Sequence, residues 1–233
     1  MGDVFEQCQV LEHNVVMATA LAKQVGKQVG KKSPRTSYHH GNLQAELLAG
    51  AMTLVRTGGP ENFSLRSLAG AIGVSPSAVY HYYSDKDSLI ETLCTQLFTE
   101  MAEMQREALE AIPGKSAKAA KERFRAIGRV YFQWAAREPH LFHMMFSGHS
   151  DLTKADSAKA ADTDAYQTLT GSLDELLEVG VLNPKIRPYG EMIAWAAVHG
   201  AASLILEGVM PRDNFEDLLD GLELALFLPG KRS

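Results

Sequence analysis

Apolar residues recur three or four positions apart along most of the chain, which is the spacing of one face of an amphipathic helix. The first such run begins at Asn42 and ends at Gly58-Gly59, because glycine terminates helices. No stretch alternates apolar and polar residues for long enough to predict a strand. We therefore predict an all-α protein. The later helices are expected over 64–72, 75 to about 82, 84 to before Pro113, a segment containing 124–134 that stops near Pro139, 160–179, about 188–207 and 214–227, with a short apolar piece at 141–146.

Two segments lack this pattern. The first 36 residues are rich in lysine and contain Gly26, Gly30 and Pro34, so we expect a flexible basic arm. They do not resemble a secretory signal, because Glu12 interrupts any apolar core, and Met17 is a second candidate for the natural start. Residues 149–158 are polar and predict a loop.

The composition is that of a globular protein in a reducing compartment. The 233 residues are 45% hydrophobic and 22% charged, which is enough to bury a sizeable core. Two cysteines argue against a disulfide framework. No run of 18 apolar residues predicts a membrane span. We expect a cytoplasmic protein without a membrane partner.

The charge is segregated along the chain. The net charge of −5 argues, for the chain as a whole, against a nucleic-acid partner. However, residues 21–84 hold seven lysines and arginines against two glutamates, and most acids follow later. Such asymmetry suggests a polyanion partner for the N-terminal part. The alternative is a solvated basic tail.

Residues 64–89 have the spacing of a helix-turn-helix motif. Ala69 allows the second helix to cross close to the first, Gly73 can take a positive φ in the turn, and Val79 faces inward. Ser64 and Ser75 are expected N-caps, the second followed by a favoured proline. For the next helix we expect Ser84 to be the N-cap and Asp87 its partner in a capping box.

With Val79 and Tyr83 inside, the opposite side of the second helix carries exposed side chains that suit the major groove of DNA. Ser77 and Tyr80 can bond base edges or phosphates, and Ala78 is small enough to approach a thymine methyl. Lys86 lies in the first turn of a helix, where a cation opposes the macrodipole. A bound phosphate would remove that conflict. The alternative is that Lys86 offsets Asp85 and Asp87.

Residues 38–98 resemble the DNA-binding domain of the TetR (tetracycline repressor) family of bacterial transcriptional regulators. The resemblance rests on Tyr38-His39-His40-Gly41-Asn42-Leu43, Ser64-Leu65-Arg66, Gly73-Val74-Ser75 and Tyr80-His81-Tyr82-Tyr83-Ser84-Asp85-Lys86-Asp87-Ser88-Leu89. It implies DNA-facing positions at Ser64, Ser75, Ser77, Ala78, Tyr80, His81, Tyr82 and Lys86, with Arg35, His39 and His40 near the backbone or minor groove. The family usually has Phe where Tyr83 stands, so its hydroxyl needs a partner or an edge position.

The last part of the chain resembles the subgroup of this family whose C-terminal domain is named for its Trp, His and Gly, here Trp195, His199 and Gly200. Residues 194–203 are nearly all small, which permits close helix–helix approach. Paired with the last helix, this helix suits a symmetric homodimer interface. The alternative is a helix of the intrachain core.

Large side chains in the C-terminal half are candidates for lining an effector pocket. They are Phe124, Tyr131, Trp134, Phe142, Met145, Phe146, Tyr166, Trp195 and His199. Stripes of this kind are more often core than cavity, and a pocket built from them would take a hydrophobic or aromatic molecule. His140, His143 and His149, with Asp151, form a candidate metal set, but no thiolate or HExxH signature supports it, and we predict no metal and no cofactor.

These observations predict a dimeric repressor that a small effector releases from a palindromic DNA operator. Its parts would be the arm (1–36), a helix-turn-helix DNA-binding domain (37–98), and an effector-binding and dimerisation domain (99–230). Two other functions stay open. An enzyme would need a nucleophile elbow, phosphate loop or paired carboxylates, none of which is evident. A dimeric adaptor that binds another protein would not show the steep salt dependence of DNA binding.

Overall fold

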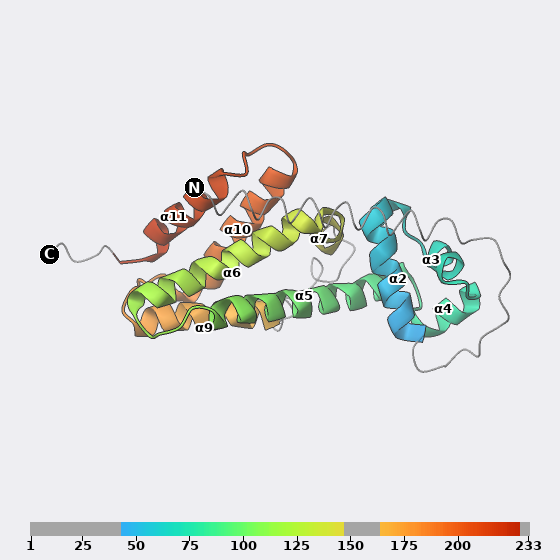
Figure 1. Cartoon of the computed structure of the whole chain (residues 1–233), viewed down its shortest axis with the longest axis horizontal. Helices are drawn as coiled ribbons and strands as arrows, with labels where there is room; N and C mark the ends of the chain where they lie inside the picture. Colours follow the sequence, from blue (N-terminus) through green and yellow to red (C-terminus); the bar gives the residue numbers. More distant parts are fainter. Residues whose placement is uncertain (1–42, 147–163, 229–233) are drawn as a thin grey trace. The chain divides into compact units, whose positions relative to one another are not determined.

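The computed structural model describes residues 43–146 and 164–228, which lie in one compact unit beginning at Gly41. Within these ranges the chain is almost entirely helical, as predicted (Figure 1). The regular elements are α2 (Leu43–Gly58), η1 (Pro60–Asn62), α3 (Leu65–Ile72), α4 (Pro76–Tyr82), α5 (Lys86–Glu110), α6 (Ala117–Arg137), α7 (Pro139–Phe146), α9 (Asp164–Glu178), η2 (Arg187–Tyr189), α10 (Gly190–Leu206) and α11 (Asn214–Leu226).

Helix α5 begins at Lys86, one residue later than its predicted cap implies, because Asp85 and not Ser84 is its N-cap. The Asp85 carboxylate accepts a hydrogen bond from the Ser88 backbone N–H at 2.8 Å, and the Ser88 hydroxyl completes the capping box. Ser84 instead donates its hydroxyl to Asp85 at 3.0 Å. A carboxylate is the better acceptor for a helix N-terminus, which explains why Asp85 displaces Ser84.

Helices α2, α3 and α4 form a small bundle with the first turns of α5. Its interior contains fully buried leucine and valine side chains from each of the four helices, namely Leu47, Val55, Leu68, Val79, Leu89 and Leu93. Helix α5 then continues past residue 98, so the boundary that the sequence suggested there falls inside a continuous helix.

Helices α5, α6 and α9 pack side by side in the second part of the described chain, and α10 and α11 pack together and on α6 (Figure 1). Gly128 lets α6 approach the last two helices. A Cβ atom there would lie 3.1 Å from Leu219 and 3.5 Å from Val198. A single antiparallel bridge between Leu182 and Phe227 is the one piece of β-pairing in the described ranges, and helical periodicity could not predict it.

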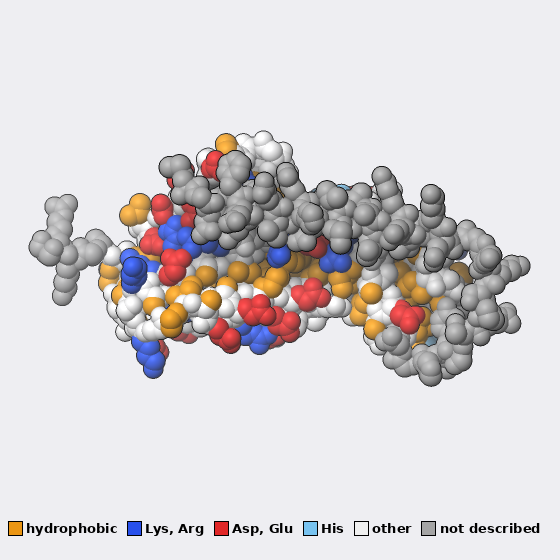
Figure 2. All heavy atoms as spheres, viewed as in Figure 1, with side chains coloured by type: hydrophobic (Ala, Val, Ile, Leu, Met, Phe, Trp, Pro, Cys, Tyr) orange, Lys and Arg blue, Asp and Glu red, His pale blue; other side chains and the backbone are white. Residues whose placement is uncertain are grey.

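Ion pairs also connect α6 to α11. Arg125 contacts Glu216, Asp220 and Glu223, and Arg129 contacts Glu216. Figure 2 shows blue and red side chains side by side on the part of the surface where α6 and α11 lie. The hydrogen bonds from Arg129 and then Arg125 outweigh burial and lower the pKa of Glu216 to about 2. This carboxylate therefore stabilises the fold above its unfolded pKa, and its contribution is lost as the pH falls toward 2.

None of the helices between 43 and 146 or between 164 and 228 is both long enough and apolar enough to cross a membrane.

Candidate nucleic-acid interface and internal cavity

The turn between α3 and α4 has the geometry that the sequence predicted. Gly73 has φ 81°, in the left-handed region that favours glycine. Ser64 caps α3 through a box with Ser67, and Ser75 caps α4 by accepting a bond from the Ala78 N–H. Val79 is fully buried, which fixes how α4 crosses α3. The ends of α3 and α4 and the angle between them are therefore determined by their own capping residues and buried side chains.

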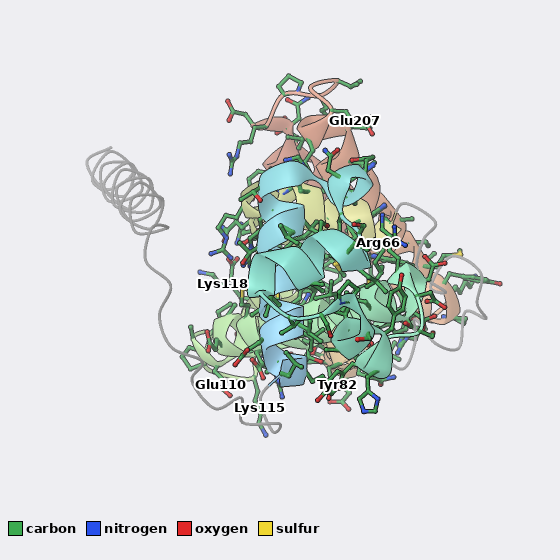
Figure 3. All side chains as sticks on the ribbon, turned by 90° about the vertical axis from the view of Figure 1, so that its right-hand side faces the viewer. Arg66, Tyr82, Glu110, Lys115, Lys118 and Glu207 are labelled. Carbon is green, nitrogen blue, oxygen red and sulfur yellow. The ribbon has the colours of Figure 1, made fainter. Side chains whose placement is uncertain are left out.

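One side of α4 presents polar and aromatic side chains to solvent. Tyr80 is 49% exposed, His81 is exposed, and the Ser75 and Ser77 hydroxyls lie 2.9 Å apart. Ala78 and Tyr82 were predicted to point outward, but both side chains are half-buried and not fully exposed. Tyr82, the last residue of α4, packs against the hydrophobic core (Figure 3).

Lys86 has a partner that neither alternative considered. Its ammonium donates a hydrogen bond to the Pro60 carbonyl at 2.8 Å and lies 5.7 Å from the Phe63 ring centroid. This bond leaves two further donors on the ammonium. Lys86 also borders a hollow on the surface. Ser64, Leu65, Arg66, Tyr80, Ser84 and Asp85 form the rest of the hollow.

Arg66 was not among the predicted DNA-facing positions. It is exposed in the first turn of α3 (Figure 3). It lines the same hollow as Lys86 and Tyr80. The sequence signal that could have identified Arg66 as DNA-facing is its position directly after Ser64-Leu65, at the start of the helix. Among the predicted positions, Arg35, His39 and His40 lie outside the described residues. Between Leu43 and Ser84 two arginines balance two glutamates, so most of the positive charge of the basic stretch precedes α2.

Tyr83 is buried among the core residues under α4, and its hydroxyl forms no hydrogen bond of normal geometry there. Burial raises the pKa of this hydroxyl, and the nearby Gln44 side chain partly opposes the shift. An unsatisfied buried hydroxyl destabilises the folded state. The sequence indicated that the Tyr83 hydroxyl needs a hydrogen-bond partner or an edge position, and in the structure this hydroxyl has neither a partner in normal geometry nor an edge position.

We predict that Tyr83→Phe stabilises the protein by about 1 kcal/mol, because it removes that unsatisfied group without leaving a cavity. Thermal unfolding should show a rise of about 2–4 °C for a chain of this size. The matched control is Tyr82→Phe, whose hydroxyl is at a half-buried surface position. A melting temperature lowered by Tyr83→Phe would contradict the assignment.

A partly open cavity of about 160 Å³ lies between α5, α6, α9, α10 and α11, with Phe146 of α7 at its wall. Five of the predicted pocket residues line it, namely Phe124, Tyr131, Phe146, Tyr166 and Trp195. The other lining residues are Phe98, Met101, Gln105, Ile127, Gly128, Ala165, Leu169, Ala194, Val198, Leu219 and Leu222. The α5 residues among them were missed, because a buried helix face looks the same in sequence whether it meets a neighbour or a void.

The other four predicted residues do not line the cavity. Trp134, Phe142 and Met145 belong to the packed core, with Trp134 and Phe142 ring centroids 6.4 Å apart. His199 lies behind the wall, where its Nδ1 is 2.8 Å from the Tyr131 hydroxyl. Burial raises the pKa of Tyr131 and lowers that of His199, so this pair is neutral at physiological pH.

Among the described residues, no group of three or more His, Cys, Asp or Glu is placed to hold a metal ion. His140 and His143 are exposed, and the nearest carboxylate to His143 is that of Glu61 at 3.8 Å. His149 and Asp151 lie outside the described residues.

A helix-turn-helix with an exposed second helix, joined to a helical domain with a cavity, defines a class of DNA-binding regulators. Residues 47–93 match the family described as bacterial regulatory proteins, tetR family, and residues 124–226 match the Tetracyclin repressor-like, C-terminal domain. The chain belongs to the TetR family of transcriptional regulators, and it is a DNA-binding regulator. The match of the C-terminal domain does not test membership of the Trp-His-Gly subgroup, so that membership stays a prediction.

Individual relatives agree with this assignment. The chain is 34% identical over 68 residues to the Uncharacterized HTH-type transcriptional regulator YvaF of Bacillus subtilis (strain 168). That match covers 29% of this chain and 35% of the relative, about a third of its length. A protein of unknown function from Rhodococcus sp. RHA1 shares the fold with TM-score 0.63 at 24% identity, over 83% of this chain and all of the other. A TetR family transcription regulator from Marinobacter aquaeolei VT8 has TM-score 0.59 at 18% identity, over 80% and 96% of the two chains.

Proposed function

We propose that the protein is a homodimeric repressor that leaves a palindromic operator when a small apolar molecule enters the cavity. The observation that carries this proposal is the apolar cavity itself, which lies among helices continuous with or packed against the helix-turn-helix. Within the chain, we propose that residues 1–36 are the arm, 37–98 the DNA-binding domain and 99–230 the effector and dimerisation domain, with α5 shared across the last boundary.

Dimerisation is supported by an exposed apolar stripe on α10 and α11. Met192 is 61% exposed and Leu224 is 86% exposed, although both are large hydrophobic side chains. Gly200 and Gly221 lie on the same helices, and a Cβ atom at either would meet nothing within 4 Å. Since helical glycine costs about 1 kcal/mol relative to alanine, close approach from outside the chain is a reason for it here. A second copy meeting this stripe through its own α10 and α11 would form a four-helix interface.

Coupling between the cavity and the DNA-binding part is supported by the two helices that reach both. Phe98 of α5 and Phe146 of α7 border the cavity, while α5 and α7 also contact α2. An ion pair of 2.9 Å between Arg56 of α2 and Glu138, directly before α7, adds a polar link. An effector that fits the cavity in only one arrangement of these helices would bias the spacing of two recognition helices in a dimer.

The direct test is a gel-shift titration against the region upstream of the protein's own gene, with scrambled DNA as competitor. Sequence-specific retardation that weakens steeply with salt is expected, because binding releases counterions from the phosphates. The absence of specific retardation at moderate salt would refute the proposal, and binding to protein but not DNA would favour an adaptor.

Tyr80→Ala should weaken specific binding about 10-fold to 100-fold while leaving non-specific binding almost unchanged. The side chain is half exposed on the presented side of α4, where it can reach base edges, and one such contact contributes about 1–3 kcal/mol. Fluorescence anisotropy with operator and scrambled duplexes measures both affinities. Equal losses for the two duplexes would make Tyr80 a structural residue.

A further inference from the structure

We infer that the effector is an uncharged molecule of about single-ring size whose hydrogen-bond donor is recognised by the side-chain carbonyl of Gln105. This inference rests on the proposed function of the cavity and specifies the chemistry that it accepts. It makes Gln105 a specificity-determining residue, and it excludes carboxylates and ammonium groups from the enclosed part of the ligand.

Gln105 lies on α5 and is only 3% exposed, which is rare for glutamine. Its side chain lines the cavity, and its Oε1 atom is buried without a hydrogen-bond partner among the described residues. Two other buried polar atoms in the described ranges lack partners, the hydroxyls of Tyr83 and Ser172, and neither residue lines the cavity. An orphaned amide oxygen costs free energy in the empty protein, so a ligand that donates to it recovers that cost.

Among the described residues, the rest of the cavity wall is apolar or already hydrogen-bonded. None of the lining residues in these ranges is Asp, Glu, Lys, Arg or His. The Tyr131 hydroxyl is engaged with His199 at 2.8 Å, whereas the Gln105 Oε1 atom has no partner. A charged ligand would lose its hydration here and gain no counter-ion, a loss that binding at such a site does not offset.

The volume of the cavity limits the size of the ligand. The cavity of about 160 Å³ is similar to an apolar cavity of about 150 Å³ that is known to hold benzene. One six-membered ring with a single small substituent therefore fills it. Phenol and toluene have nearly equal size and shape, and they differ in the hydroxyl that Gln105 would recognise.

The test is titration calorimetry of the full chain without DNA, at pH 7, with phenol, toluene, benzaldehyde and benzoate as probes. Phenol is expected to bind about fivefold to tenfold more tightly than toluene, since one net hydrogen bond contributes about 1 kcal/mol. Benzaldehyde, which only accepts hydrogen bonds, should gain nothing over toluene, and benzoate should not bind. Equal affinities for phenol and toluene, a preference for benzaldehyde or benzoate, or no binding by any probe would overturn the inference.

Gln105→Leu should abolish the preference for phenol by lowering phenol affinity to that of toluene. The variant should fold at least as well as the wild type, because an unsatisfied buried amide is replaced by an apolar group of similar size. Gln96→Leu makes the same change on α5 outside the cavity, where the amide bonds Glu100 at 2.9 Å, and it should keep the preference. Persistence of the preference in Gln105→Leu would refute the role of Gln105.

Failure of this inference and failure of the proposed function have different signatures. The calorimetry contains no DNA, so a protein that binds no operator can still prefer phenol. Conversely, equal binding of phenol and toluene would overturn the donor requirement, yet operator release by some other molecule would still support the repressor.

Discussion

Leu224→Glu should convert the protein into a monomer and reduce its affinity for a palindromic operator by at least about 100-fold. Leu224 is 86% exposed in the described chain, so the substitution disturbs little within one copy. In a dimer through α10 and α11 the new carboxylate would be buried without a partner, at a cost of several kcal/mol. Loss of the dimer also separates the two half-site contacts.

Sedimentation velocity and operator titration together measure this effect. Gln133→Glu adds the same charge change at an exposed position of α6, and it should remain dimeric and bind operator normally. A Leu224→Glu protein that sediments as a dimer would place the interface elsewhere. An unchanged melting curve at low protein concentration would verify that each copy remains folded.

Ala165→Phe should abolish the response to effector while leaving operator binding intact. Ala165 is buried at the start of α9 and lines the cavity, so a phenyl ring there would occupy the volume that the ligand needs. Binding of a ligand of single-ring size should fall by at least about 100-fold, because its apolar contacts are lost and no room remains.

Ligand binding by calorimetry and ligand-induced release in a gel shift provide the two readouts. Gln133→Phe adds the same ring at an exposed position of α6 and should respond like the wild type. If Ala165→Phe still released DNA at wild-type ligand concentrations, the effector would bind outside this cavity. If the variant could not bind DNA even without ligand, the ring would have forced the helices into the released arrangement.

The helix-turn-helix was predictable because each of its determinants is local. Gly73 needs a positive φ, Ser64 and Ser75 cap the helices that follow them, and Val79 must face inward, all within 16 residues. The N-cap of α5 was predicted wrongly, because two adjacent acceptors compete there, Ser84 and Asp85. The spacing of residues in the sequence does not show which of two adjacent acceptors caps the helix.

The cavity was predictable only in part, because it depends on how five helices meet. Tyr131 and Trp134 lie three residues apart on α6, yet the first lines the void and the second fills the core. Gln105 carried no sequence signal, since a polar residue on a long helix is ordinarily at the surface. Its burial follows from the packing of α6 and α9 on α5.

The bond between Lys86 and the Pro60 carbonyl has a mechanical consequence. It fastens the first turn of α5 to the segment that leads into α3, while the adjoining Phe63 ring lies beneath the same ammonium. We expect a tilt of α5 to move α3 and α4 with it, with the angle between these two helices unchanged. In the proposed dimer, such a tilt would change the distance between the two helix-turn-helix units and would leave each unit intact.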